Sequence, residues 1–128
     1  MYFCTPISSY FRKLKNMYPD EMTSPEQVAD FIKKEAAVLL YFYSDSCAPC
    51  LSLRPKVVEL ICDSFPEIKI TFVNGENAPM IPAKFTAFSF PTLLVFFEGK
   101  EYIRESKYVA IPQLAASISR PYKLLFEI

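Results

Sequence analysis

Apolar and polar residues alternate along this chain in patterns that predict a regular succession of helices and strands. Periodic apolar stretches predict helices over 23–34, 48–64, 78–87 and 111–119, and apolar or alternating runs predict strands over 36–43, 68–73, 92–98 and 101–107. A strand–helix–strand unit followed by a β-hairpin predicts an α/β fold, with a central mixed β-sheet flanked by helices on both faces.

Local signals mark where several of these elements begin, bend or end. The segment 23–27 combines hydroxyl caps with Pro25 in the first turn, which is typical of a helix start. Pro55 lies inside the second helix and should kink it, because proline lacks one backbone donor. Pro121 should end the last helix, so residues 122–128 are expected to form a short apolar tail that packs back on the domain.

Residues 1–22 precede this pattern and are expected to form an N-terminal extension to a domain spanning 23–128. Apolar side chains recur at helical spacing within the extension and predict one short helix; they are Tyr10, Phe11, Leu14, Met17 and Tyr18. An extra helix packed on the domain is one interpretation, and a helix that binds a partner or a membrane surface is the other.

The composition of the chain indicates a globular domain and argues against several classes of protein. The chain has 128 residues, of which 52% are hydrophobic, so a single domain with a substantial core is expected. Fourteen basic and fourteen acidic residues cancel, so no affinity for nucleic acid is expected. The absence of an 18-residue apolar run argues against a membrane span, and no secretory signal is apparent, so a cytoplasmic location is expected.

The chain contains no histidine, which excludes Ser–His and Cys–His catalysis and imidazole ligation of a metal. Any chemistry must therefore depend on Cys, Asp, Glu, Lys or Tyr. We expect no cofactor and no metal. A zinc half-site with Cys62 as a third ligand is the alternative, but no further cysteine pair completes a tetrahedron.

The tetrapeptide Cys47-Ala48-Pro49-Cys50 carries the clearest chemical signal. It follows a buried strand and opens a helix, so one thiol lies where helix N–H groups are unpaired and the other lies one turn further in. This arrangement is typical of a thiol–disulfide exchange site, with an inert structural pair as the alternative. Cys62 is expected to be a buried core cysteine. Cys4 is expected to be a surface thiol, with a redox relay as the alternative.

Four features at fixed spacing make this chain resemble the thioredoxin family. Cys47-Ala48-Pro49-Cys50 matches the active-site motif, and Pro55, five residues after the second cysteine, matches the proline in the active-site helix. Pro91, 41 residues after the second cysteine, falls at the cis-proline of the family, and the hairpin at 96–101 is also similar. The resemblance covers about residues 23–120 and implies a thioredoxin-like fold with Pro91 in the cis form.

Several positions near the motif depart from the family pattern. Tyr41 stands where many thioredoxins have a buried Asp that helps to move protons, and Phe90 is bulkier than the common Thr, Val or Ile. The other departures are Tyr43 and Ser46 in place of Trp, Leu51 in place of Lys, and the lack of glycine within 107–110. Tyr41 and Asp45 are the nearest candidates for proton handling.

These residues favour a thiol–disulfide oxidoreductase that reduces protein disulfides. Cys47 at the helix N-terminus is expected to be the nucleophile, and the more buried Cys50 is expected to resolve the mixed disulfide. Phe90, Pro91, Ala48 and Pro49 are expected to bind substrate. The partners expected are protein disulfides, with a thioredoxin reductase or a thiol pool as electron donor. The alternative is a redox-sensing or protein-binding module with slow or no turnover, which Tyr41 and Phe90 favour.

Overall fold

The computed structural model describes residues 22–127. Of the N-terminal extension at 1–22 only Met22 is described, so the helix predicted there and Cys4 lie outside the described residues. Four helices and four strands are found in the described part of the chain, in the order predicted from the sequence. They are α2 (Pro25–Lys34), β1 (Ala37–Tyr43), α3 (Ala48–Ser64), β2 (Lys69–Asn74), α4 (Met80–Lys84), β3 (Thr92–Phe97), β4 (Lys100–Ser106) and α5 (Ile111–Phe126).

The four strands form one mixed sheet with the order β2-β1-β3-β4. β1 pairs in parallel with β2 and antiparallel with β3, and β3 pairs antiparallel with β4. All seven residues of β1 are buried, because this central strand has a neighbour on each side and helices over both faces. The apolar run that predicted a buried strand is therefore explained by its position in the middle of the sheet.

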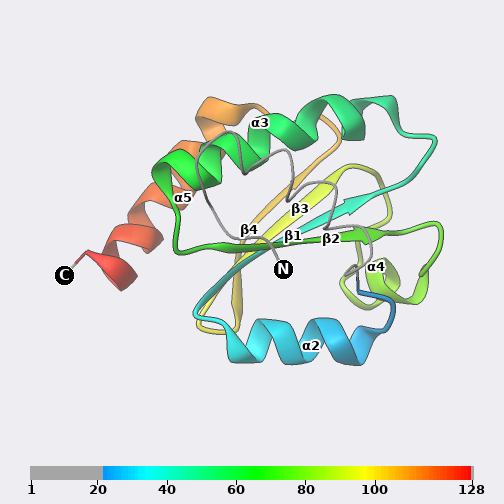
Figure 1. Cartoon of the computed structure of the whole chain (residues 1–128), viewed down its shortest axis with the longest axis horizontal. Helices are drawn as coiled ribbons and strands as arrows, with labels where there is room; N and C mark the ends of the chain where they lie inside the picture. The colour runs from blue at the N-terminus through cyan, green and yellow to red at the C-terminus, as the bar shows by residue number, and fades with distance from the viewer. Residues whose placement is uncertain (1–21, 128) are drawn as a thin grey trace.

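Helices cover the two faces of the sheet, with α3 and α5 on one side and α2 and α4 on the other (Figure 1). Alternate residues of β1 point to opposite faces and divide the core in two. Leu39 and Tyr41 belong to the cluster with α3 and α5, whereas Leu40 and Phe42 belong to the cluster with α2 and α4. This three-layer arrangement is the predicted thioredoxin-like α/β fold.

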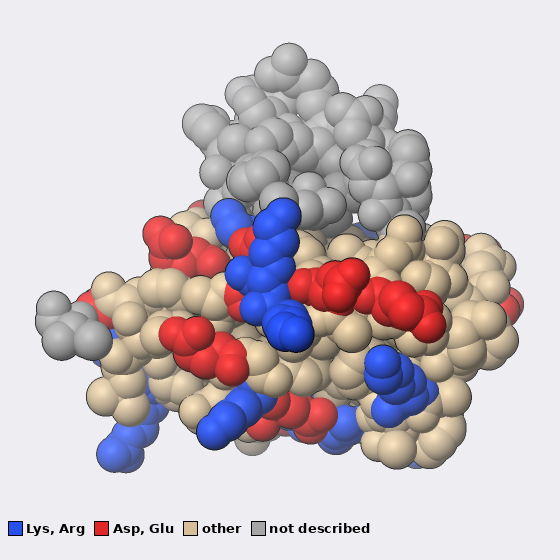
Figure 2. Space-filling model, turned by 90° about the horizontal axis from the view of Figure 1, so that it is seen from below, with Lys and Arg blue, Asp and Glu red and all other residues tan. Residues whose placement is uncertain are grey.

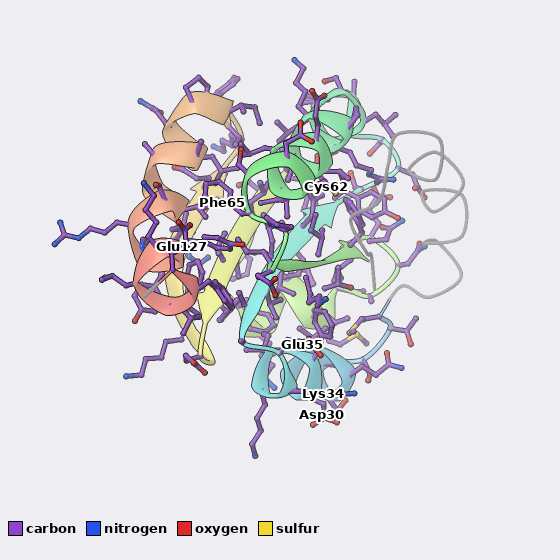
Figure 3. The ribbon with its side chains drawn as sticks, turned by 60° about the vertical axis from the view of Figure 1, so that its left-hand side comes forward. Asp30, Lys34, Glu35, Cys62, Phe65 and Glu127 are labelled. Carbon is purple, nitrogen blue, oxygen red and sulfur yellow. A yellow bond between two sulfur atoms is a disulfide. The ribbon has the colours of Figure 1, made fainter. Side chains whose placement is uncertain are left out.

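The start of α2 follows the local signal in the sequence. Ser24 is the N-cap, its hydroxyl accepts a hydrogen bond from the backbone N–H of Gln27, and the Gln27 side chain accepts from the Ser24 N–H at 3.2 Å. Pro25 occupies the first turn, where its missing N–H costs nothing. Asp30 and Lys34 lie one turn apart on the exposed outer side of this helix (Figure 3).

Charged residues of both signs are interspersed on the face of the molecule seen from the α2 side. Figure 2 shows Lys and Arg interspersed there with Asp and Glu, without a large area of one sign.

The helices in the described part of the chain include none with the length and apolar character that a membrane span requires.

The prediction that Pro121 ends the last helix is wrong. α5 runs from Ile111 to Phe126 with Pro121 inside it, so the expected separate tail is the last part of the helix. Packing compensates for the missing N–H: Tyr122 is buried, its ring centroid lies 5.1 Å from that of Phe65, and its hydroxyl accepts the Glu67 N–H at 3.2 Å. Tertiary contacts therefore outweigh the local preference of proline.

Candidate active site

The tetrapeptide Cys47-Ala48-Pro49-Cys50 lies where β1 gives way to α3. Cys47 is the N-cap residue of α3, with an extended backbone, and its Sγ accepts a hydrogen bond from the Cys50 N–H at 3.2 Å. Pro49 lies in the first turn, where the helix needs no donor. The sulfur of Cys47 therefore takes the place that a Ser or Asp oxygen takes at other helix starts, close to the positive end of the helix.

Cys47 and Cys50 form a disulfide, with their Cα atoms 5.3 Å apart. The two sulfurs differ in their surroundings, because Cys47 is half-buried whereas Cys50 is completely buried. Ala48 and Pro49 between them are exposed. This arrangement presents one sulfur to a reaction partner and keeps the other behind it. The structure thus brings together the two cysteines that the sequence singled out.

A groove of about 340 Å³ lies beside the disulfide. Pro91 lines it together with Pro49, Lys56, Lys107 and Tyr108. The peptide bond between Phe90 and Pro91 is cis, as the resemblance implies. Tyr108 is 95% exposed, so its ring is available to a bound segment. Ala48 and Phe90, the other predicted substrate-binding residues, are not among the lining residues of this groove.

The groove continues along α3 into a larger depression of about 620 Å³. The two share Leu53, Lys56 and Val109, and the larger one also carries the acidic Glu59 and Asp63. A segment that extends from the disulfide in this direction therefore meets a lysine first and carboxylates further along.

Phe90 is turned toward the interior and is half-buried. It packs against both halves of the core, and a Cβ atom on Gly75 would overlap its ring. Gly75 has no positive φ, so it is needed here for space, not for backbone conformation. The exposed phenylalanine next to the site is Phe88, with 80% of its surface accessible. Any apolar docking surface at this edge therefore depends on the side chain of Phe88 more than on that of Phe90.

Tyr41 lies beneath the active-site helix and is completely buried. Its hydroxyl donates a hydrogen bond of 2.6 Å to the backbone carbonyl of Cys50. Burial raises the pKa of Tyr41 well above its ordinary value, so the phenol stays protonated at neutral pH. Tyr41 is therefore not a base for the thiols, and its role is to fasten the first turns of α3 to β1.

Sequence reasoning missed Arg54. Only 5% of the surface of this charged residue is exposed. Its guanidinium carbon lies 4.4 Å from the ring centroid of Tyr43, 4.8 Å from that of Phe72 and 6.0 Å from that of Tyr41. These are cation–π distances. The available signal was its spacing, since Arg54 lies four residues after Cys50 and thus on the same side of the predicted helix.

The loop before the first cysteine is fastened to the loop after β2. The Ser46 hydroxyl donates to Oε1 of Glu76 at 2.9 Å, and hydrogen bonds from Ser46 and Ser44 lower the pKa of Glu76 from its ordinary value. Asn74 Oδ1 in turn accepts the backbone N–H of Glu76 at 3.0 Å. These contacts hold the residue next to Cys47 in place.

Cys62 is half-buried on α3 rather than fully buried, so the prediction of a core cysteine is only partly right (Figure 3). Its side chain packs against the core cluster beneath α3 and remains partly accessible. Among the described residues, no group of three or more His, Cys, Asp or Glu side chains is arranged to hold a metal ion.

Comparison with known proteins shows one family consistently. The thioredoxin family model matches residues 19–120. The chain is 30% identical over 97 residues to the thioredoxin-like protein YdfQ of Bacillus subtilis, an alignment that covers 76% of this chain and 86% of that protein. It is 32% identical over 108 residues to the chloroplastic thioredoxin M-type of Triticum aestivum, covering 83% of this chain but 61% of that protein.

Solved structures share the fold. Mitochondrial thioredoxin 3 of Saccharomyces cerevisiae, in its oxidised form, superposes with a TM-score of 0.68 at 19% identity. The superposition covers 77% of this chain and 91% of that one. At this identity the likeness supports the architecture alone.

Proposed function

The chain belongs to the thioredoxin family, and we propose that it reduces protein disulfides through a dithiol formed by Cys47 and Cys50. The observation that carries this proposal is the pairing of a half-buried sulfur at a helix N-terminus with a completely buried sulfur one turn later. The first is accessible to a substrate disulfide, and the second is accessible only to the first.

In the first step, the Cys47 thiolate attacks one sulfur of the substrate disulfide. A Cys47–substrate bond forms, the substrate S–S bond breaks, and the second substrate sulfur leaves as a thiolate that takes up a proton. The helix N-terminus favours this step, because its partial positive charge and the Cys50 N–H stabilise the Cys47 thiolate.

In the second step, Cys50 loses its proton and attacks the sulfur of Cys47. The Cys47–Cys50 disulfide forms, the mixed disulfide breaks, and the remaining substrate sulfur leaves as a thiol after protonation. Two electrons have then passed from the dithiol to the substrate. An external reductant, either a thioredoxin reductase or a thiol pool, returns the protein to its dithiol form.

Substrate binding is assigned to the groove beside the disulfide and the residues around it. Pro49 and Pro91 line the groove, and Ala48 is exposed between the two cysteines. An extended segment that pairs with the backbone near Phe90 would bring its disulfide to Cys47, in the manner of a strand added to a sheet edge.

A redox-sensing or protein-binding module is the second candidate. Tyr41 favours it, because its phenol is protonated and donates to the Cys50 carbonyl, whereas a carboxylate at this depth would accept a proton. Such a protein would form the same disulfide but would turn over slowly.

The test is the reduction of insulin disulfides with dithiothreitol as electron donor. We expect wild-type protein to accelerate the reaction, Cys47→Ser to abolish the acceleration, and Cys50→Ser to accumulate mixed disulfides that mass spectrometry detects. Cys62→Ser is the matched control, because Cys62 lies on the same helix but outside the disulfide, so its replacement should leave the rate unchanged. Full activity in Cys47→Ser protein would refute the proposal, and disulfide formation without turnover would favour the sensing module.

A further inference from the structure

Arg54 is the one charged side chain among the buried residues that the structure describes. Two rings hold its guanidinium at close range, Tyr43 at 4.4 Å and Phe72 at 4.8 Å from the guanidinium carbon to the ring centroids. The first ring belongs to β1 and the second to β2, so the positive charge is fixed between α3 and the parallel part of the sheet. A cation placed at this depth has an effect on its neighbours that solvent screens only weakly.

The closest reactive group along the chain is Cys50. Residues four apart on a helix are neighbours, with Cβ atoms about 5–6 Å apart. Side chains on a helix also lean toward its N-terminus, so the Arg54 side chain leans toward the turn that carries Cys50. Tyr41 contacts both, because its hydroxyl donates to the Cys50 carbonyl and its ring centroid lies 6.0 Å from the guanidinium carbon.

We propose that Arg54 is a positioning residue whose buried positive charge stabilises the thiolate of Cys50 and thereby raises the redox potential of the dithiol. This inference rests on the proposed function, since it concerns the second step of that reaction. Of the ionisable groups, the rings of Tyr41 and Tyr43 on β1 lie at 6.0 Å and 4.4 Å from the guanidinium carbon, and Cys50 lies one turn before Arg54 on α3.

The need for such a charge follows from the burial of Cys50. A thiol in apolar surroundings resists ionisation, yet only the thiolate attacks the Cys47 sulfur in the second step. A nearby cation offsets this resistance. Desolvation lowers the pKa of Arg54 from its ordinary value, but a guanidinium begins so far above neutrality that it keeps its charge. The same charge favours the reduced state, which contains the thiolate, over the disulfide, which contains none.

The experiment compares redox potentials of full-length wild-type, Arg54→Met, Arg54→Lys and Arg120→Met proteins in glutathione buffers. Methionine keeps an unbranched side chain without the charge, lysine keeps the charge, and Arg120 is an exposed arginine on α5 that serves as the control. We expect Arg54→Met to favour the disulfide about tenfold more than wild type, a potential about 30 mV more negative. The redox potential of Arg54→Lys should lie closer to that of wild type than the potential of Arg54→Met does. The potential of Arg120→Met should equal that of wild type.

Two results would overturn the inference in distinguishable ways. A wild-type dithiol with a normal transition and an unchanged potential in Arg54→Met would refute the role of Arg54 alone. Failure of wild-type protein to form the Cys47–Cys50 disulfide at any glutathione ratio would remove the proposed function and this inference with it.

A second measurement leaves Arg54 intact and so does not depend on the folding of its variants. The thiolate absorbance of Cys47→Ser protein, minus that of Cys47→Ser/Cys50→Ser protein, reports the ionisation of Cys50 alone. We expect Cys50 to ionise below about pH 8.5, the ordinary thiol value, in spite of its burial. A midpoint at or above that value would contradict the inference.

Discussion

Gly75 leads to the sharpest structural prediction, because a single added methyl group at this position would collide with Phe90. The Cβ atom of an alanine would overlap the end of the Phe90 ring. A shift of the ring would disturb its packing against both core clusters, and Phe90 directly precedes the cis bond to Pro91. Forcing an extra carbon into a packed site costs about 1–3 kcal/mol, so Gly75→Ala should lower the free energy of unfolding by about that amount.

The assay is urea unfolding of the oxidised protein, with wild type, Gly75→Ala, Phe90→Leu and the double variant measured together. Leucine lacks the outer ring carbons that the new methyl group would meet, so Gly75→Ala should cost less in the Phe90→Leu background. We expect a coupling free energy of at least about 0.5 kcal/mol between the two positions, which is the range for residues in contact.

Gly99 provides the matched control for this cycle. A Cβ at Gly99 would meet no atom within 4 Å, but its φ of +80° is a conformation that alanine adopts only with strain. Gly99→Ala should therefore also be destabilising. However, it should lower the free energy of unfolding by the same amount whether position 90 is phenylalanine or leucine. Additive effects of Gly75→Ala and Phe90→Leu would refute the reasoning about space.

Three further predictions concern residues around the site. Tyr41→Phe removes the hydroxyl that donates to the Cys50 carbonyl and should cost about 1 kcal/mol in urea unfolding; an unchanged midpoint would contradict this. Ser46 and Ser44 hold the pKa of Glu76 below its ordinary value, so this stabilisation is present above the unfolded pKa of about 4.3 and is lost as the pH falls through the folded pKa. Ser46→Ala should therefore be destabilising at pH 7, and its effect on the free energy of unfolding should shrink as the pH falls through the folded pKa of Glu76. A loss that does not change with pH would show that the Glu76 carboxylate is not the group responsible. Lys107 has a φ of 65°, so Lys107→Gly should relieve strain and stabilise the protein by up to about 1 kcal/mol in thermal unfolding, whereas a lower melting temperature would show that the lysine side chain matters more.

The elements that position the site could be predicted from local sequence, because each carries its own signal. The apolar run at 36–43 indicated a buried strand, which the structure shows as β1, and the cysteine pair indicated a helix start. Pro91 was identified by its spacing from Cys50, and the structure confirms the cis form that the family resemblance implied.

Contacts between distant segments could not be predicted in this way. Pro121 reads locally as the end of a helix, but the contact of Tyr122 with Phe65 carries α5 onward. The spacing of Arg54 from Cys50 places both on one side of α3, but the burial of Arg54 depends on Tyr43 and Phe72, which lie on different strands. The inward orientation of Phe90 likewise depends on space left by Gly75. Each of these features is set by side chains brought together only in the folded sheet.

The central claim is that Cys47 and Cys50 form a working dithiol, and a redox titration tests it most directly. Wild-type protein would be equilibrated with glutathione buffers of defined ratio, alkylated and digested. The mass of the peptide that contains residues 47–50 would then be measured by mass spectrometry. We predict one two-electron transition between a disulfide form and a form with two alkyl groups, nearer to about −270 mV, as in a reductant, than to about −120 mV, as in an oxidant. Two free thiols at every ratio, or glutathione adducts without the internal disulfide, would contradict the claim.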